Sequence, residues 1–164
     1  MPLIKLFGIF ILNQACVYMI CILFSFIILM NILKAQILDL PKILDKRGNL
    51  SIIEEFKNIP FKIERAYWIY DVPGGETRGG HAYKENQEFI VALSGSFDVI
   101  LDDGQEKKTF SLSRSYYGLY VPKGLWREMN NFSTNSLALV LASTPYDADD
   151  YIYDYNEFIK LNNE

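Results

Sequence analysis

The sequence predicts an all-β domain over most of its length, either a sandwich of two sheets or a small closed barrel. After residue 34, many short segments alternate between apolar and polar residues, and turn-forming residues separate them at regular spacing. The dipeptide Asp103-Gly104 stands between two of these segments and is a strong signal for a type I′ hairpin. These observations favour antiparallel strands that pack face to face.

The expected strands follow this alternation along the chain. Two short strands flank a turn at residues 45–49, and residues 61–70 alternate strongly enough for a half-buried strand that ends at the turn 71–75. Residues 149–161 predict a short C-terminal helix that begins at a capping aspartate. The expected strands are 37–40, 50–54, 61–70, 88–93, 96–101, 107–112, 118–121, 127–130 and 137–142.

The chain divides into an apolar N-terminal segment, residues 1–34, and an expected globular domain, residues 35–164. Residues 7–33 carry no charge and are long enough for a membrane-spanning helix. A cleaved secretory signal fits less well, because the apolar run is too long and no small-x-small cleavage site follows it. A start codon placed too early is the third interpretation, since a domain beginning near Met30 would be complete. If the segment is an anchor, the basic residues after it outnumber Lys5 and place the body in the cytoplasm.

Composition excludes some classes of function. A net charge of −4 argues against a nucleic-acid-binding protein, whose affinity depends on excess Lys and Arg that neutralise phosphates. A small phosphorylated ligand held by a few arginines remains compatible with this charge. Both cysteines, Cys16 and Cys21, lie in the apolar segment, so the globular part contains neither a thiol nor a disulfide. That usage suits a reducing compartment.

One stretch has the spacing of the first cupin motif, G-x5-H-x-H-x4-E-x6-G. Gly75, His81, Glu88 and Gly95 occupy its positions, and Tyr83 stands where the second histidine would be. Because residues two apart on a strand point to the same face, we expect His81 and Tyr83 to face into a barrel together. Glu88 is expected to join them from the next strand.

A second stretch, residues 122–131, matches the second cupin motif, P-x-G-x2-H-x3-N, with arginine at the histidine position. The positions that bind metal in metal-dependent cupins therefore hold His81, Tyr83, Glu88 and Arg127. A guanidinium group stays protonated and does not ligate a cation, so we expect no metal and no other cofactor. The imidazole is then expected to keep its lone pair free of competitors, which makes it a candidate base.

A family resemblance is carried by short sequence segments along the rest of the chain, at residues 45–50, 59–63, 78–82, 93–96, 101–104, 118–122, 126–129, 141–143 and 150–152. In this order they resemble the sugar-nucleotide 3,4-ketoisomerases of the FdtA/QdtA (WxcM-like) cupin family. The resemblance covers roughly residues 37–161. It implies a cupin (RmlC-like) jelly-roll barrel with a short C-terminal helix, preceded in this chain by an apolar N-terminal helix.

The resemblance also implies an activity. In this family a metal-free cupin converts dTDP-4-keto-6-deoxyglucose into a dTDP-3-keto-6-deoxyhexose, which leads to acetamido-dideoxy sugars of surface polysaccharides. The enzymes are dimers that exchange N-terminal strands, and two histidines form the catalytic pair. Here the first histidine is His81 and the second is replaced by Tyr83. We therefore expect a cytoplasmic homodimer, with membrane contact if residues 7–33 form an anchor.

The reaction suggests a role for each candidate residue. Moving a ketone from C4 to C3 needs a base at C3, a group that stabilises the enediolate and a proton for C4. His81, with an ordinary pKa of about 6.5, suits the base, whereas Tyr83, near 10, suits a hydrogen-bond donor. The alternative for Tyr83 is simple packing with its hydroxyl satisfied. The alternative for His81 is a histidine that takes no part in chemistry.

Arginines are the expected contacts for a nucleoside diphosphate, because their fork geometry matches phosphate oxygens. Arg65 shares a strand face with Tyr67, although a surface salt bridge to a glutamate at 54–55 is its alternative. Arg47 is placed near the pocket by the resemblance alone, and its alternative role is to fix a turn. Glu88 is expected either to orient His81 or to pair with an arginine. The expected substrate-binding residues are Arg47, Arg65, Tyr67, Arg78, Glu88 and Arg127.

Two other functions stay open at this stage. A cupin that binds a sugar nucleotide without turnover would be the outcome if losing the second histidine abolished catalysis. A 3,5-epimerase-like activity fits less well, because it needs a His-Asp base and a tyrosine acid at spacings that this sequence lacks. The leading prediction is an isomerase.

Overall fold

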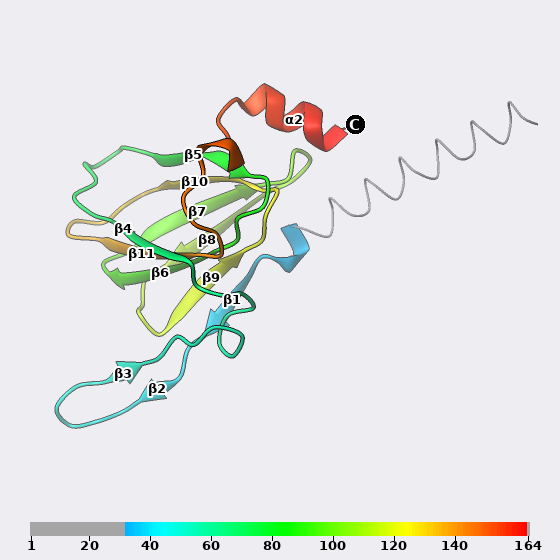
Figure 1. Ribbon diagram of the computed structural model, residues 1–164. Helices are drawn as coiled ribbons and strands as arrows, with labels where there is room; N and C mark the ends of the chain where they lie inside the picture. The colour runs from blue at the N-terminus through cyan, green and yellow to red at the C-terminus, as the bar shows by residue number, and fades with distance from the viewer. Residues whose placement is uncertain (1–31, 164) are drawn as a thin grey trace, which may run out of the picture.

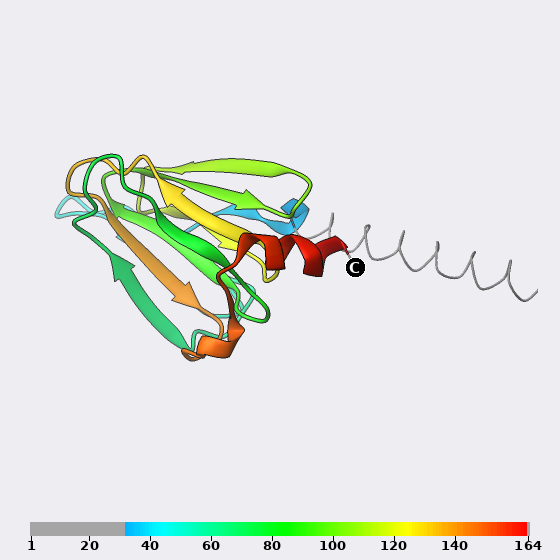
Figure 2. The same ribbon diagram turned by 90° about the horizontal axis from the view of Figure 1, so that it is seen from above.

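Two five-stranded antiparallel sheets face each other in the computed structural model, which describes residues 32–163 (Figures 1 and 2). The first sheet has the order β1-β9-β6-β11-β4 and the second β12-β5-β10-β7-β8. The first comprises β1 (Gln36–Asp39), β4 (Arg65–Ile69), β6 (Glu88–Ser94), β9 (Tyr117–Val121) and β11 (Leu137–Ala142). The second comprises β5 (Arg78–Tyr83), β7 (Phe97–Asp102), β8 (Lys107–Leu112), β10 (Trp126–Asn130) and β12 (Tyr151–Ile152). The prediction of an all-β fold is confirmed.

The main core lies between the sheets and follows the alternation of the strands. Along β7, Phe97, Val99 and Leu101 are at most 1% exposed, whereas the residues between them are partly exposed. These side chains pack with Met129 from the neighbouring strand β10 and with Ile90 from β6 in the facing sheet. Such a strand has one face on the core and one toward solvent, as its period of two requires.

Strand β6 is buried on both faces because a second apolar cluster covers the outside of the first sheet. Phe89 and Val91 point outward and pack against Ile59 and Phe61. The chain between β3 (Leu50–Ser51) and β4 therefore runs over the sheet as an irregular cover. For this reason the predicted strand 50–54 ends early, and the predicted strand 61–70 begins only at its fifth residue.

A small hairpin of β2 (Lys42–Ile43) and β3 extends away from the two sheets (Figure 1). The predicted apolar N-terminal segment, residues 1–34, with its possible membrane anchor or early start codon, lies outside the described residues as far as residue 31. Over residues 32–163, no helix is both long and apolar enough to cross a membrane. Ile32 is 1% exposed and belongs to the main core, so packing begins before the expected domain boundary at residue 35.

The hairpin between β7 and β8 forms as expected, but the predicted type I′ turn is wrong. The loop has four residues, and Asp103 Oδ1 accepts hydrogen bonds from the backbone nitrogens of Gln105 and Glu106 at 2.9 and 2.8 Å. Gly104 alone takes a positive φ, of 92°. A type I′ turn needs positive φ at both central residues, and the carboxylate of Asp103 instead stabilises a wider turn.

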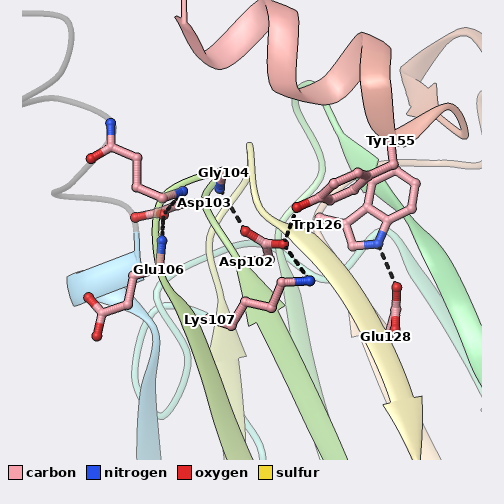
Figure 3. Close-up of polar contacts among 9 residues, drawn as sticks. Asp102, Asp103, Gly104, Glu106, Lys107, Trp126, Glu128 and Tyr155 are labelled. Atoms are coloured by element: carbon pink, nitrogen blue, oxygen red, sulfur yellow. Dashed lines mark hydrogen bonds and ion pairs between the residues drawn. The ribbon is translucent and has the colours of Figure 1, made fainter.

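The C-terminal helix α2 (Tyr155–Asn163) begins later than predicted, because residues 148–152 form a short 3-10 turn, η1 (Ala148–Asp150), and strand β12. Asp154 caps the helix by accepting from the backbone nitrogens of Asn156 and Glu157. Figure 3 shows Tyr155 donating to the buried carboxylate of Asp102 at 2.7 Å, which fixes α2 to the β7–β8 hairpin. Because α2 begins only at Tyr155, residues 151–152 form strand β12, which pairs with β5.

Candidate active site

A cavity of about 350 Å³ opens between β4 at the edge of the first sheet and β5 in the second sheet. Two arginines, a histidine and several tyrosines give it a wall that is both cationic and aromatic. The lining residues are Arg65, Tyr67, Trp68, Ile69, Arg78, Gly79, His81, Tyr83, Tyr146 and Tyr151. Five of the eight residues predicted for the site line this cavity: His81, Tyr83, Arg65, Tyr67 and Arg78.

Strand β5 places His81 against Arg127 through an irregularity in its pairing with β10. His81 lies opposite Arg127, and the register then shifts by one residue so that Glu128 lies opposite Gly79. Gly79 has a φ of 92°, and a Cβ atom there would lie 2.7 Å from the backbone oxygen of Arg127. Only glycine fits this bulge, which turns the strand and directs His81 toward the cavity.

The lone pair of His81 is occupied, contrary to expectation. Nη2 of Arg127 lies 3.0 Å from Nε2 of His81. A guanidinium group can only donate, so Nε2 accepts, and the ring proton sits on Nδ1, where the backbone of Gly79 provides a partner. Burial and then the charge of Arg127 lower the pKa of His81 to about 3. The imidazole is therefore neutral and already hydrogen-bonded.

A buried ion pair connects the two sheets behind this histidine. Glu88 on β6 is 1% exposed, and its Oε2 lies 2.9 Å from Nε of Arg127 on β10. Its other oxygen accepts a 2.5 Å hydrogen bond from the hydroxyl of Tyr67. Of the two contacts expected for Glu88, the structure shows the pairing with an arginine, and Glu88 acts on His81 through Arg127. Burial opposes the charge of Arg127, but Glu88, Tyr67 and Tyr83 together outweigh burial and raise the pKa of Arg127 above its ordinary value.

Tyr83 and Tyr151 form a pair of hydroxyls at the same cavity. Pairing of β12 with β5 puts Tyr151 directly opposite Tyr83, and the Tyr83 hydroxyl donates to the Tyr151 hydroxyl at 3.2 Å. Both rings contact His81, with centroid distances of 4.9 and 5.1 Å. Burial, followed by the charge of Glu88, raises the pKa of Tyr83 far above its ordinary value, so its phenol stays protonated.

The remaining predicted arginines differ in their surroundings. Arg65 lies 5.6 Å from the ring of Tyr67 and 5.7 Å from that of Tyr146, and within residues 32–163 it forms no salt bridge to an acidic residue. Arg78 is exposed at the mouth of the cavity. Arg47 does not line the cavity in this chain. It lies in the turn between β2 and β3, where its side chain is 90% exposed and pairs with Asp45 at 2.9 Å.

A family model described as FdtA, WxcM-like, C-terminal, matches residues 33–163 of this chain. The chain belongs to the FdtA family. A relative from Aneurinibacillus thermoaerophilus, TDP-4-oxo-6-deoxy-alpha-D-glucose-3,4-oxoisomerase, is 46% identical over 125 residues, which is 76% of this chain and 90% of the relative. The resemblance to sugar-nucleotide 3,4-ketoisomerases is confirmed.

Solved structures agree with the FdtA assignment. A 3,4-ketoisomerase from Helicobacter canadensis has a TM-score of 0.78 and 41% identity, over 80% of this chain and 98% of that structure. QdtA from Thermoanaerobacterium thermosaccharolyticum in complex with TDP has a TM-score of 0.76 and 37% identity, over 78% and 93%. The dTDP-4-dehydrorhamnose 3,5-epimerase of Bacillus anthracis shares only the fold, with a TM-score of 0.64 and 18% identity over 72% and 77%. The predicted RmlC-like cupin fold is thereby confirmed.

Sequence reasoning missed two parts of the site in this FdtA family member. The predicted C-terminal helix includes Tyr151, whereas the alternation in Tyr151-Ile152-Tyr153 and the aspartate that follows are signals for a strand before a cap. The contact between Arg127 and His81 was missed because it depends on the bulge at residues 79–80. No group of three His, Cys, Asp or Glu side chains placed to hold a metal occurs among residues 32–163.

Proposed function

We propose that this protein converts dTDP-4-keto-6-deoxyglucose into a dTDP-3-keto-6-deoxyhexose by proton transfer between C3 and C4, as part of deoxyamino sugar synthesis for surface polysaccharides. Its relatives named as 3,4-oxoisomerases and 3,4-ketoisomerases support this substrate and reaction. The observation that carries the proposal is the neutral His81 imidazole, which faces a cavity beside two phenol hydroxyls. Isomerisation of a ketone needs such a base and such donors.

His81 takes the proton from C3 at Nε2 in this proposal. The electron pair of the broken C3–H bond forms the C3–C4 double bond, and O4 becomes negatively charged. Arg127 must leave Nε2 for the base to act, and a substrate oxygen at O4 offers its guanidinium a charged partner. Once the charge of Arg127 is balanced by O4, the main electrostatic cause of the low His81 pKa is weakened. His81 then returns the proton to C4 while the hydrogen of the O3 hydroxyl passes to O4, and the electron pair left on O3 forms the C3 carbonyl.

Arg65, Arg78 and Tyr67 bind the diphosphate and sugar in this proposal. Nε of Arg65 is buried without a hydrogen-bond partner among residues 32–163, so it is available to a ligand. The reaction uses no metal or other cofactor, because Arg127 sits between His81 and Glu88 at the metal-binding positions of the cupin pattern. No nucleic acid takes part.

The active form in this proposal is a cytoplasmic homodimer, which accounts for the exposed arm of β2 and β3. Leu44 and Leu50 on this arm are 75% and 55% exposed, an arrangement that suits contact with a second copy. Arg47 at its tip would then serve the partner's pocket rather than its own. Of the proposed membrane contact through residues 7–33, residues 7–31 lie outside the described residues.

The test is incubation with dTDP-4-keto-6-deoxyglucose and an aminotransferase specific for 3-keto sugars, which traps the product. We expect turnover by the wild type and a loss of about 10²–10⁴-fold in His81→Asn, the usual contribution of a general base. Protein beginning near Met30 serves as the control for the apolar segment. Calorimetric binding of the substrate without product would overturn the proposal and leave a binding protein.

A further inference from the structure

We propose that the hydroxyls of Tyr83 and Tyr151 form a proton relay that carries a proton from O3 to O4 of the sugar while His81 moves the proton between carbons. This inference rests on the proposed function and adds Tyr151 as a second catalytic tyrosine. It starts from the direct contact of the two hydroxyls at the wall of the cavity, 3.2 Å apart.

The reaction requires two proton movements, and one histidine accounts for only one of them. When the ketone moves from C4 to C3, a hydrogen leaves C3 and arrives at C4. A second hydrogen leaves the hydroxyl O3 and arrives at O4. His81 Nε2 is the base for the carbon-bound hydrogen, and burial in the site favours fixed protein groups over water for the second. A pair of groups that accepts at one end and donates at the other meets this need.

The register of β12 on β5 sets the two hydroxyls in the required order. Tyr83 donates to Tyr151, which leaves a lone pair on the Tyr83 oxygen to accept from O3 and the hydrogen of Tyr151 to donate to O4. Oxygens on neighbouring sugar carbons lie about as far apart as two hydrogen-bonded oxygens, so the pair spans them. Both rings contact His81, so the carbon and oxygen transfers share one location.

The relay balances in atoms and charge. The O3–H bond breaks and its proton passes to the Tyr83 oxygen, the Tyr83 proton passes to the Tyr151 oxygen, and the Tyr151 proton forms the new O4–H bond. The electron pair left on O3 forms the C3 carbonyl as C4 accepts its proton from His81. Neither phenol remains ionised, which agrees with the buried position of Tyr83 beside the negatively charged Glu88.

The test compares Tyr83→Phe, Tyr151→Phe and the double variant by kcat/KM for trapped 3-keto product. Each phenylalanine keeps the ring and removes one hydroxyl. We expect a loss of about 10²-fold for each single variant, as for a general acid or base. The double variant should lose no more than either single one, because residues that act as a unit are not additive. Tyr153→Phe is the matched control, since Tyr153 stacks on Tyr151 at 5.2 Å, and its activity should be unchanged.

A second readout separates the relay from a structural effect. In Tyr151→Phe, His81 and Arg127 remain, so exchange of the C3 hydrogen with deuterated solvent should continue while product formation falls. His81→Asn should lose both the exchange of the C3 hydrogen and the formation of product. Tyr151→Phe with turnover within threefold of the wild type would overturn the relay alone, as would additive losses in the double variant. A wild type that forms no product would overturn the proposed function and the relay with it.

Discussion

Two buried polar clusters in this molecule differ in how completely their hydrogen bonds are satisfied. Beneath α2, Asp102 accepts from the backbone nitrogen of Gly104, the hydroxyl of Tyr155 and Nζ of Lys107, at 2.7, 2.7 and 3.1 Å (Figure 3). By contrast, Nε of Arg65 at the cavity and Nη1 of Arg127 behind His81 are buried without hydrogen-bond partners among residues 32–163.

This difference in hydrogen bonding indicates that one cluster stabilises the fold and the other binds a ligand. Leaving a buried donor unpaired costs about 1–3 kcal/mol, so a fold that keeps such donors needs a reason beyond stability. The cluster at Asp102 has its contacts in place and fixes one element to another. The cluster at the cavity keeps cationic donors available, as expected for a site that binds a diphosphate and stabilises an oxyanion. The predictions below test whether the two clusters separate stability from catalysis in this way.

The largest effect is expected from Glu88→Gln. This change leaves the guanidinium of Arg127 buried without its counterion, and breaking a buried pair in this way costs about 3–5 kcal/mol in the free energy of unfolding. Turnover should also fall, because Arg127 holds His81. Urea denaturation measures the stability, and the trapping assay measures turnover.

Glu85→Gln is the matched control for that variant. Glu85 pairs with Lys123 at 2.6 Å, but its side chain is 70% exposed, so we expect a loss of about 0–1 kcal/mol. Equal losses in the two variants would contradict the distinction between a buried and a solvated pair.

The next largest effect is a dependence of the free energy of unfolding on pH, caused by His81. The pKa of His81 is about 3 in the folded protein, because of burial and Arg127, and about 6.5 in an unfolded chain. Between these values the unfolded chain binds a proton that the folded protein does not. This contribution to stability is complete above about pH 6.5 and is lost as the pH falls toward about 3.

Urea denaturation at a series of pH values checks this prediction against His81→Asn. The wild type should lose more stability than the variant as the pH falls from about 7 toward about 4, because only the wild type has the imidazole. Parallel pH profiles would show that His81 is not held neutral by its surroundings.

The candidate site residues could be predicted wherever a residue type suited to the chemistry stands at a position of a known motif or on one face of a predicted strand. The two cupin motifs predicted that His81, Glu88 and Arg127 lie together, and the period of two placed Tyr83 on the same strand face as His81. Arg65 and Tyr67 followed from one alternating strand. The structure places Arg127 in contact with His81 and Glu88, and Arg65 and Tyr67 line the same cavity as His81.

The remainder depends on contacts between distant parts of the chain. Tyr151 joins the site because two residues of β12 pair with β5, and this pairing joins parts of the chain that lie far apart in the sequence. The hydrogen bond that occupies His81 depends on a one-residue shift of register near Gly79. Phe61 lies outside β4, although the sequence predicts it within that strand, because its side chain packs on the apolar outer face of the first sheet. Tertiary packing decided each of these features.

Apart from the control variants, the smallest effect on stability is expected from Tyr155→Phe, which tests the cluster at Asp102. The variant removes one hydrogen bond to the carboxylate of Asp102, and bonds to charged groups contribute about 1.5–3 kcal/mol. We expect the lower end of that range, since Lys107 and the backbone of Gly104 still contact the same carboxylate. Turnover should not change, because the ring of residue 155 still packs on Trp126.

Denaturation and trapping assays on the same preparation decide the outcome for Tyr155→Phe. Tyr70→Phe is the control, because Tyr70 is 61% exposed and loses little on removal of its hydroxyl. A variant that keeps its stability but loses turnover would place α2 in the catalytic machinery, and the two clusters would then not be separate. A variant that loses stability alone assigns the cluster at Asp102 to the fold and leaves catalysis to the donors at the cavity.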